Sequence, residues 1–159
     1  MFQKAPITAR SLADQYVAAI HMAGQGILAI EKEAKGGPVL LQINLNFSSP
    51  LSTSLSQAFM HTTQPGHNRN TEELKEELAV IMAGEVAEKM LLGQAGKGSI
   101  TSIEHAECLA ECIFYDEIVK NGSIGLRPGS TEEKIAPLLD AAKADATEVL
   151  TRRKADLEK

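Results

Sequence analysis

Apolar positions recur at helical spacing near the start of the chain, from about residue 11 to residue 35. Successive members lie three or four positions apart, which places them on one face of an α-helix. This face comprises Leu12, Tyr16, Ala19, Ile20, Ala23, Ile27, Ile30 and Ala34. Gly36-Gly37-Pro38 then interrupts the pattern, because glycine and proline terminate helices. We therefore expect one long amphipathic helix that packs this face against the core.

The period of the pattern changes between Val39 and Phe47. Apolar residues now alternate with Gln42, Asn44 and Asn46, which predicts a half-buried β-strand. The following stretch, residues 55–63, is compatible with either a second strand or a short helix. A small β element near residues 39–62 is therefore expected in a chain that is otherwise helical.

Three further helices are predicted from residues that are typical of helix ends. The second helix is expected to start after Asn70 and to end at Gly93, and Gly84 inside it predicts close helix packing. A capping signature at Thr101 opens the third helix, which should stop near residues 121–122. The fourth begins at Ser130, where Pro137 (beyond the first turn) should kink it or delay its start. The fold class predicted is mainly α, with about four principal helices.

Composition narrows the class of protein. A chain of 159 residues that is 43% hydrophobic can bury one sizeable core, so a single domain over residues 1–159 is expected. The net charge of -5 and the absence of tryptophan disfavour nucleic-acid binding. No apolar run approaches the roughly 20 residues of a membrane span, and no signal-peptide core precedes the first helix. These features predict a cytoplasmic location.

Two cysteines, Cys108 and Cys112, lie four residues apart on the third predicted helix. Side chains at that spacing have Cβ atoms roughly 5–6 Å apart, whereas a disulfide requires about 3.8 Å. We therefore expect free thiols, buried as small hydrophobic side chains.

His21 and Gln25 share one face of the first predicted helix. Zinc metallopeptidases with a His-Glu-x-x-His motif use that spacing, because its two imidazoles bind the metal while the glutamate acts as general base. In this chain the five residues read His21-Met22-Ala23-Gly24-Gln25. The first histidine is therefore present, and the base and the second histidine are replaced.

The order and spacing of several segments resemble the C-terminal peptidase domain of FtsH-type ATP-dependent zinc metalloproteases, over nearly the whole chain. The family's His-Glu-Ala-Gly-His helix matches residues 21–25, and its strand region matches residues 38–46. Its Ile-Ala-Val-Leu-Leu-Gly-Gly-Arg-Ala-Ala-Glu-Glu helix matches residues 78–88. Its last helices resemble residues 135–146. The family's ATPase domain has no counterpart here, since no Gly-x-x-x-x-Gly-Lys-Ser/Thr pattern occurs.

The resemblance implies an FtsH-like peptidase fold and locates the third zinc ligand. That ligand is an aspartate in a Thr-Gly-Ala-x-Asn-Asp-Leu segment, and the matching residues 98–106 place Ser102 at its position. Peptidase domains of this family form hexameric rings, so the resemblance also implies a ring-forming homo-oligomer.

These replacements change the chemistry that the resemblance would imply. A catalytic zinc site needs about three protein ligands and a bound water. Met22 cannot accept a proton, Gln25 offers only a neutral amide, and Ser102 offers a neutral hydroxyl. We therefore expect a catalytically degenerate pseudo-peptidase without zinc, which binds other proteins or assembles with itself.

An alternative is an active metal-dependent hydrolase with relocated ligands. His105 lies one helical turn from Ser102 and could face His21, and Cys108 is one further turn along. A metal cluster of His21, His105 and Cys108 would then replace the lost ligands. The competing interpretation is a partly buried histidine with thiols that pack as small hydrophobic groups, because such spacings arise easily on helices. A further alternative is that the chain is one domain of a longer polypeptide whose other part supplies the activity.

Overall fold

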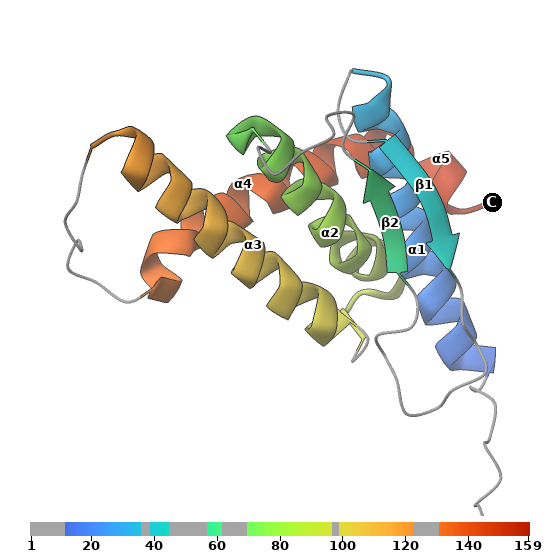
Figure 1. The fold of residues 1–159 in the computed structure, drawn as a ribbon. Coiled ribbons are helices and arrows are strands. Elements are labelled where there is room, and N and C mark those ends of the chain that lie inside the picture. Colours follow the sequence, from blue (N-terminus) through green and yellow to red (C-terminus); the bar gives the residue numbers. More distant parts are fainter. Residues whose placement is uncertain (1–11, 36–38, 45–56, 62–69, 97–98, 123–130) are drawn as a thin grey trace, which may run out of the picture.

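The computed structural model describes residues 12–35, 39–44, 57–61, 70–96, 99–122 and 131–159; in the two strand segments and at Thr101 it describes the backbone alone. The fold is mainly α-helical, as the sequence predicts (Figure 1). The elements are α1 (Leu12–Glu33), β1 (Val39–Asn44), β2 (Gln57–His61), α2 (Thr71–Leu92), α3 (Ser99–Lys120), α4 (Thr131–Arg152) and α5 (Lys154–Leu157).

The two strands pair antiparallel beside α1 (Figure 1). Val39 lies opposite His61 and Asn44 lies opposite Gln57, with an irregular register between Leu40 and Gln42. The segment β1 covers the first part of the alternating stretch, and residues 45–47 of that stretch lie outside the described residues. Of the two conformations that the sequence leaves open for residues 55–63, the strand is the one found at 57–61.

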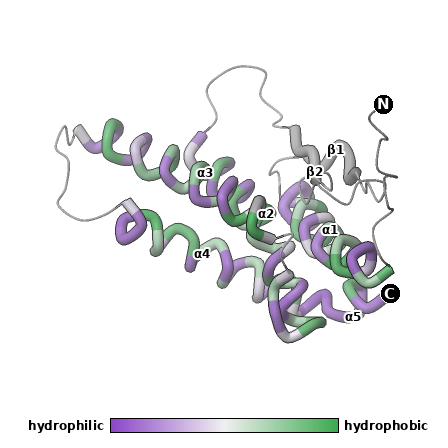
Figure 2. The backbone as a smooth tube through the Cα atoms, turned by 90° about the horizontal axis from the view of Figure 1, so that it is seen from below, coloured by the Kyte–Doolittle hydropathy of each residue, from purple (hydrophilic) through white to green (hydrophobic). Residues whose placement is uncertain are grey.

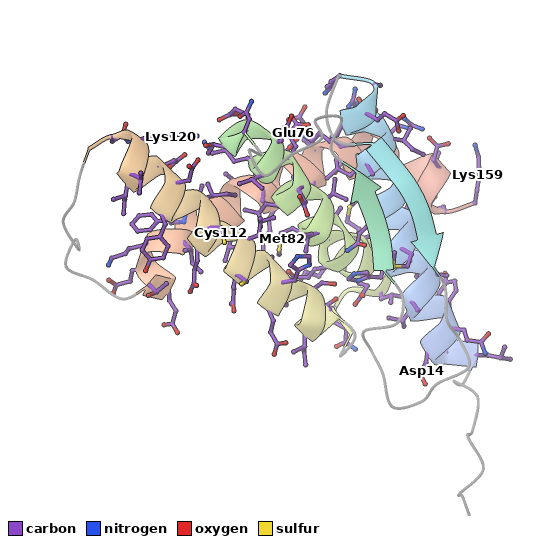
Figure 3. All side chains as sticks on the ribbon, in the orientation of Figure 1. Asp14, Glu76, Met82, Cys112, Lys120 and Lys159 are labelled. Atoms are coloured by element: carbon purple, nitrogen blue, oxygen red, sulfur yellow. The ribbon has the colours of Figure 1, made fainter. Side chains whose placement is uncertain are left out.

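Helix α2 occupies the centre of the fold, and α1, α3 and α4 all pack against it (Figure 1). Every residue from Leu78 to Glu88 is buried, and all of them except Glu85 and Glu88 are apolar or glycine, as expected for the part of a helix that other elements cover on all sides. Figure 3 shows Met82 of this segment in the interior between the helices, whereas Lys120 marks the outer end of α3.

Helix α1 approaches the backbone of α2 closely because both carry small residues at the crossing. A Cβ added to Gly24 would lie 2.5 Å from the Ala87 Cβ atom and 2.6 Å from the Ala83 carbonyl oxygen. Both distances are too short for real atoms, so only glycine permits this approach.

The end signals of α2 are confirmed. The Asn70 side chain accepts a hydrogen bond from the Glu72 backbone N–H at 2.8 Å, which satisfies one of the free donors of the first turn. Gly93 ends the helix with φ of 77°, a left-handed conformation that glycine adopts without strain.

The predicted apolar face of α1 is wrong in part. Leu12 is 84% exposed and Tyr16 is 60% exposed, and Ile30 and Ala34 are exposed as well. The buried face instead runs through polar positions: it comprises Ile20, His21, Met22, Gly24, Gln25, Gly26, Leu28, Ala29 and Lys32. Figure 2 shows hydrophobic and hydrophilic residues interleaved along this helix. The polar members can be buried because α2, α3 and α4 supply partners for them, which periodicity alone cannot predict.

Helix α3 also differs from the prediction. It begins at Ser99, two residues before the expected capping residue Thr101. Its buried positions include Ala106, Ala110 and Ile113. Cys108 and Cys112 are free thiols, but both are exposed, so the prediction of buried cysteines is wrong. They point away from the core because they lie on the opposite face of α3 from these buried residues.

Pro137 lies inside α4, which already begins at Thr131, so the proline does not delay the start of this helix. The C-terminal stretch forms two helices, because α4 ends at Arg152 and Leu157 belongs to the short helix α5. None of the helices among the described residues is long and apolar enough to cross a membrane.

Candidate functional site

The imidazole of His21 lies where α1, α2 and α3 meet. Its Nδ1 atom is 2.7 Å from Glu88 Oε1 of α2, and its Nε2 atom is 3.0 Å from Ser102 Oγ of α3. The residue is 7% exposed. Three elements far apart in the sequence therefore contribute one side chain each to a continuous line of hydrogen bonds.

Gly84 makes room for this ring. A Cβ atom added there would lie 2.3 Å from His21 Nε2 and 2.4 Å from Cε1. The ring therefore lies directly against the backbone of α2, in the place where any other residue would carry a side chain. The close packing predicted at Gly84 is confirmed, and its partner is the histidine.

Glu88 is held by donors on both carboxylate oxygens. Oε1 accepts the Ser99 hydroxyl at 2.9 Å in addition to His21 Nδ1–H, and Oε2 accepts the backbone N–H of Gly96. Burial raises the pKa of Glu88, but the hydrogen bonds from His21, Gly96 and Ser99 and the attraction to His21 together lower it below the ordinary value of 4.5. The carboxylate is therefore ionised at neutral pH.

The ionised carboxylate determines which nitrogen of His21 carries the proton. Because Glu88 can only accept, Nδ1 is the donor and Nε2 presents a lone pair in the neutral ring. Two donors approach that lone pair: the Ser102 hydroxyl, and Gln25 Nε2 at 3.1 Å. Gln25 Nε2 also donates to the Ile81 carbonyl oxygen at 3.2 Å, which sets the orientation of the amide.

The structure brings His21, Gln25 and Ser102 together at one point. These are the three positions where the resemblance places zinc ligands. Met22, at the position of the family's general base, is buried with 1% exposure. Here the nitrogen of His21 that would coordinate a metal is engaged by an amide and a hydroxyl.

The residues of the relocated-ligand hypothesis are not brought together. His105 and Cys108 are exposed on α3, whereas His21 is buried between the helices. Within the described ranges, no group of three histidine, cysteine or acidic side chains is arranged to hold a metal ion.

Sequence reasoning missed Glu88, Ser99 and Gly96 as members of the site. A signal for the first exists, because Glu85 and Glu88 interrupt an otherwise apolar segment of α2. Charged groups inside a buried helix require partners, so such a residue indicates a polar contact from a neighbouring element. Ser99 and Gly96 carry no comparable signal, since they reach the carboxylate only because the end of α2 and the start of α3 lie close together.

The chain matches no known family model, and no curated protein is detected as a relative. Its function is therefore inferred from the residues and geometry of this site.

The arrangement can hold and move a proton. A hydroxyl, an imidazole and an ionised carboxylate lie in sequence, with the imidazole oriented by the carboxylate. Ser102 is partly exposed, while the two residues behind it are buried. The hydroxyl is therefore the member of the line nearest to solvent.

Proposed function

We propose that this chain is a pseudo-peptidase: an FtsH-like peptidase domain that has lost its zinc chemistry and acts by binding other polypeptides or by assembling with itself. The observation that carries the proposal is the set of hydrogen bonds at His21 Nε2. Both of its neighbours at the ligand positions, Gln25 and Ser102, offer it hydrogen-bond donors.

The orientation of Gln25 supports the loss of the metal. A zinc ion would require an electron pair from this position, which an amide could supply only through its carbonyl oxygen. The Ile81 carbonyl oxygen instead holds the amide nitrogen in place, 3.1 Å from His21 Nε2. The side chain therefore presents a donor where a ligand would be needed.

Exposed apolar side chains support a role in binding polypeptides. Leu12 and Tyr16 lie one helical turn apart at the start of α1, and Tyr115 and Val119 lie one turn apart near the end of α3; all four are exposed. Apolar side chains paired in this way on a helix surface suit a docked peptide or a second copy of the chain.

The test compares the wild-type chain with a variant that rebuilds the family's ligand set: Met22→Glu, Gln25→His and Ser102→Asp combined. Zinc is measured by elemental analysis after dialysis, and casein cleavage is measured with added zinc. We expect no stoichiometric zinc and no cleavage in the wild type, and zinc retention in the triple variant. One tightly held zinc per wild-type chain, or zinc-dependent cleavage by it, would contradict the proposal.

Self-assembly is tested separately by the solution mass of the wild type and of a Leu12→Ser, Tyr16→Ser double variant over a range of concentrations. We expect an oligomer whose mass falls in the double variant. A wild type that stays monomeric at every concentration would remove self-assembly and leave only heterologous binding.

A further inference from the structure

The line of contacts through His21 has the order of a nucleophile, a base and an orienting acid. Ser102 Oγ is 3.0 Å from His21 Nε2, and His21 Nδ1 is 2.7 Å from Glu88 Oε1. Serine hydrolases activate their nucleophile with this order of groups, on unrelated folds. We propose that Ser102 Oγ is a nucleophile that accepts acyl groups from carboxylic esters, with His21 as its base and Glu88 as the positioning residue.

The base is prepared for this role by the residues behind it. Glu88 is fixed by the Ser99 hydroxyl and the Gly96 backbone N–H, so it cannot turn away from the ring. It holds the proton on His21 Nδ1, which leaves the Nε2 lone pair for the serine proton. The ring itself has no room to move, because it lies against Gly84.

The position of Ser102 suits attack on a carbonyl. It lies in the first turn of α3, a helix of 22 residues that begins at Ser99. Partial positive charge at a helix N-terminus stabilises negative charge that develops nearby. The oxygen of the substrate carbonyl acquires such a charge when Ser102 Oγ bonds to its carbon.

Each step conserves atoms and electrons without a metal or a redox partner. Ser102 Oγ forms a bond to the ester carbonyl carbon while its proton passes to His21 Nε2. The bond from that carbon to the alcohol oxygen breaks, and the departing oxygen takes the proton from His21. Water then attacks the acyl-serine, with His21 first accepting its proton and then returning it to Ser102 Oγ as the carboxylic acid departs.

Gln25 limits the reactivity of the site. Its amide N–H competes with the serine hydroxyl for the same lone pair of His21 Nε2. This competition favours slow acylation, which is suited to detection by a covalent probe.

The test treats the full chain with a fluorophosphonate, in the presence of a metal chelator, and follows the intact mass and the modified peptide over time. We expect one adduct per chain on Ser102, no adduct in Ser102→Ala, and a rate about 100-fold lower in His21→Gln. Thr147→Ala removes a hydroxyl that bonds the Lys143 carbonyl oxygen on α4, away from the site, and should react like the wild type.

Circular dichroism and thermal unfolding establish that each variant is folded before its rate is compared. Glu88→Gln should lower the rate while retaining Ser102 as the modified residue, and para-nitrophenyl acetate should leave an acetyl group on the same serine. Absence of an adduct on Ser102 in folded wild type, or an unchanged rate in folded His21→Gln, would overturn the proposal. Because the chelator is present throughout, this result is independent of the zinc measurement that tests the loss of metal chemistry.

Discussion

The central helix α2 buries two glutamates, and their partners differ in kind. Glu88, toward α1 and α3, receives an imidazole N–H, a serine hydroxyl and a backbone N–H. Glu85, toward α4, receives lysine ammonium groups: Lys89 Nζ donates to its Oε1, and Lys143 Nζ lies 3.7 Å from its Oε2.

The contacts of Glu88 fix the geometry of neighbouring side chains, whereas those of Glu85 only neutralise its charge. Glu88 accepts hydrogen bonds from an imidazole that is held against backbone, from a short serine side chain and from a main-chain N–H. Each of these donors can point in only one direction. Lys89 is exposed and Lys143 is partly exposed, and a lysine is a point charge on a flexible stem. The network around Glu88 therefore holds His21 in one orientation, whereas the pairs around Glu85 allow side chains to shift at little cost.

The largest expected effect comes from displacing the ring that this network holds. Gly84→Ala places a methyl carbon 2.3 Å from His21 Nε2, far closer than van der Waals contact, and should lower the free energy of unfolding by about 3 kcal/mol, measured by urea denaturation. Gly93→Ala is the matched control: nothing lies within 4 Å of its new Cβ, so only the strain of a positive φ remains, about 1 kcal/mol. Equal losses in the two variants would argue against a tightly held ring.

The two glutamates can be compared by the same isosteric change. Glu88→Gln turns an acceptor oxygen into an NH₂ group and leaves a buried donor without its partner, which should cost about 2 kcal/mol. Glu85→Gln should cost less than about 1 kcal/mol, because its lysine partners can turn to solvent. Thermal and urea unfolding of both variants measures the difference. A larger loss of stability in Glu85→Gln than in Glu88→Gln would contradict the distinction between the contacts of the two glutamates.

Low pH should reduce the contribution that ionised Glu88 makes to the stability of the fold. The pKa of Glu88 is lowered in the folded chain, so its contribution to stability is complete above the ordinary value of 4.5 and is lost as pH falls through the folded pKa. Unfolding measured from pH 7 down to pH 3 should therefore show a steeper loss below pH 4.5 in the wild type than in Glu88→Gln. Parallel curves would show that the hydrogen bonds do not favour the ionised form.

The smallest effect is expected at Lys32, a buried lysine of α1 that pairs with Asp145 and lies 3.8 Å from Glu76. Lys32→Met retains the apolar stem and removes the charge, while both acidic partners stay partly exposed. We expect a change within about 1 kcal/mol of zero in the free energy of unfolding. A loss of stability as large as that of Glu88→Gln would show that this ion pair fixes its side chains in place, as the contacts of Glu88 do.

The helices were predictable where their signals are local. The asparagine cap and the glycine stop of α2 act within a few residues of the chain, so Asn70 and Gly93 mark its ends correctly. The grouping of His21, Gln25 and Ser102 was suggested by the order of segments rather than by any single motif.

The faces of the helices were less predictable. Periodicity assumes that polar residues face solvent, and α1 departs from this because Glu88 and Asp145 lie where its His21 and Lys32 need partners. The face of Cys108 was missed because small residues such as Ala106 and Ala110 bury as readily as thiols. Glu88 was missed because its role depends on contacts from three separate parts of the chain.

The most direct test of the account follows the nitrogen resonances of the His21 ring by long-range ¹H–¹⁵N spectroscopy while zinc is added. We expect a ring protonated on Nδ1, whose Nε2 resonance does not change at one equivalent of zinc. A stoichiometric shift of the Nε2 resonance would show that this nitrogen coordinates metal, and would contradict the proposed absence of a zinc site.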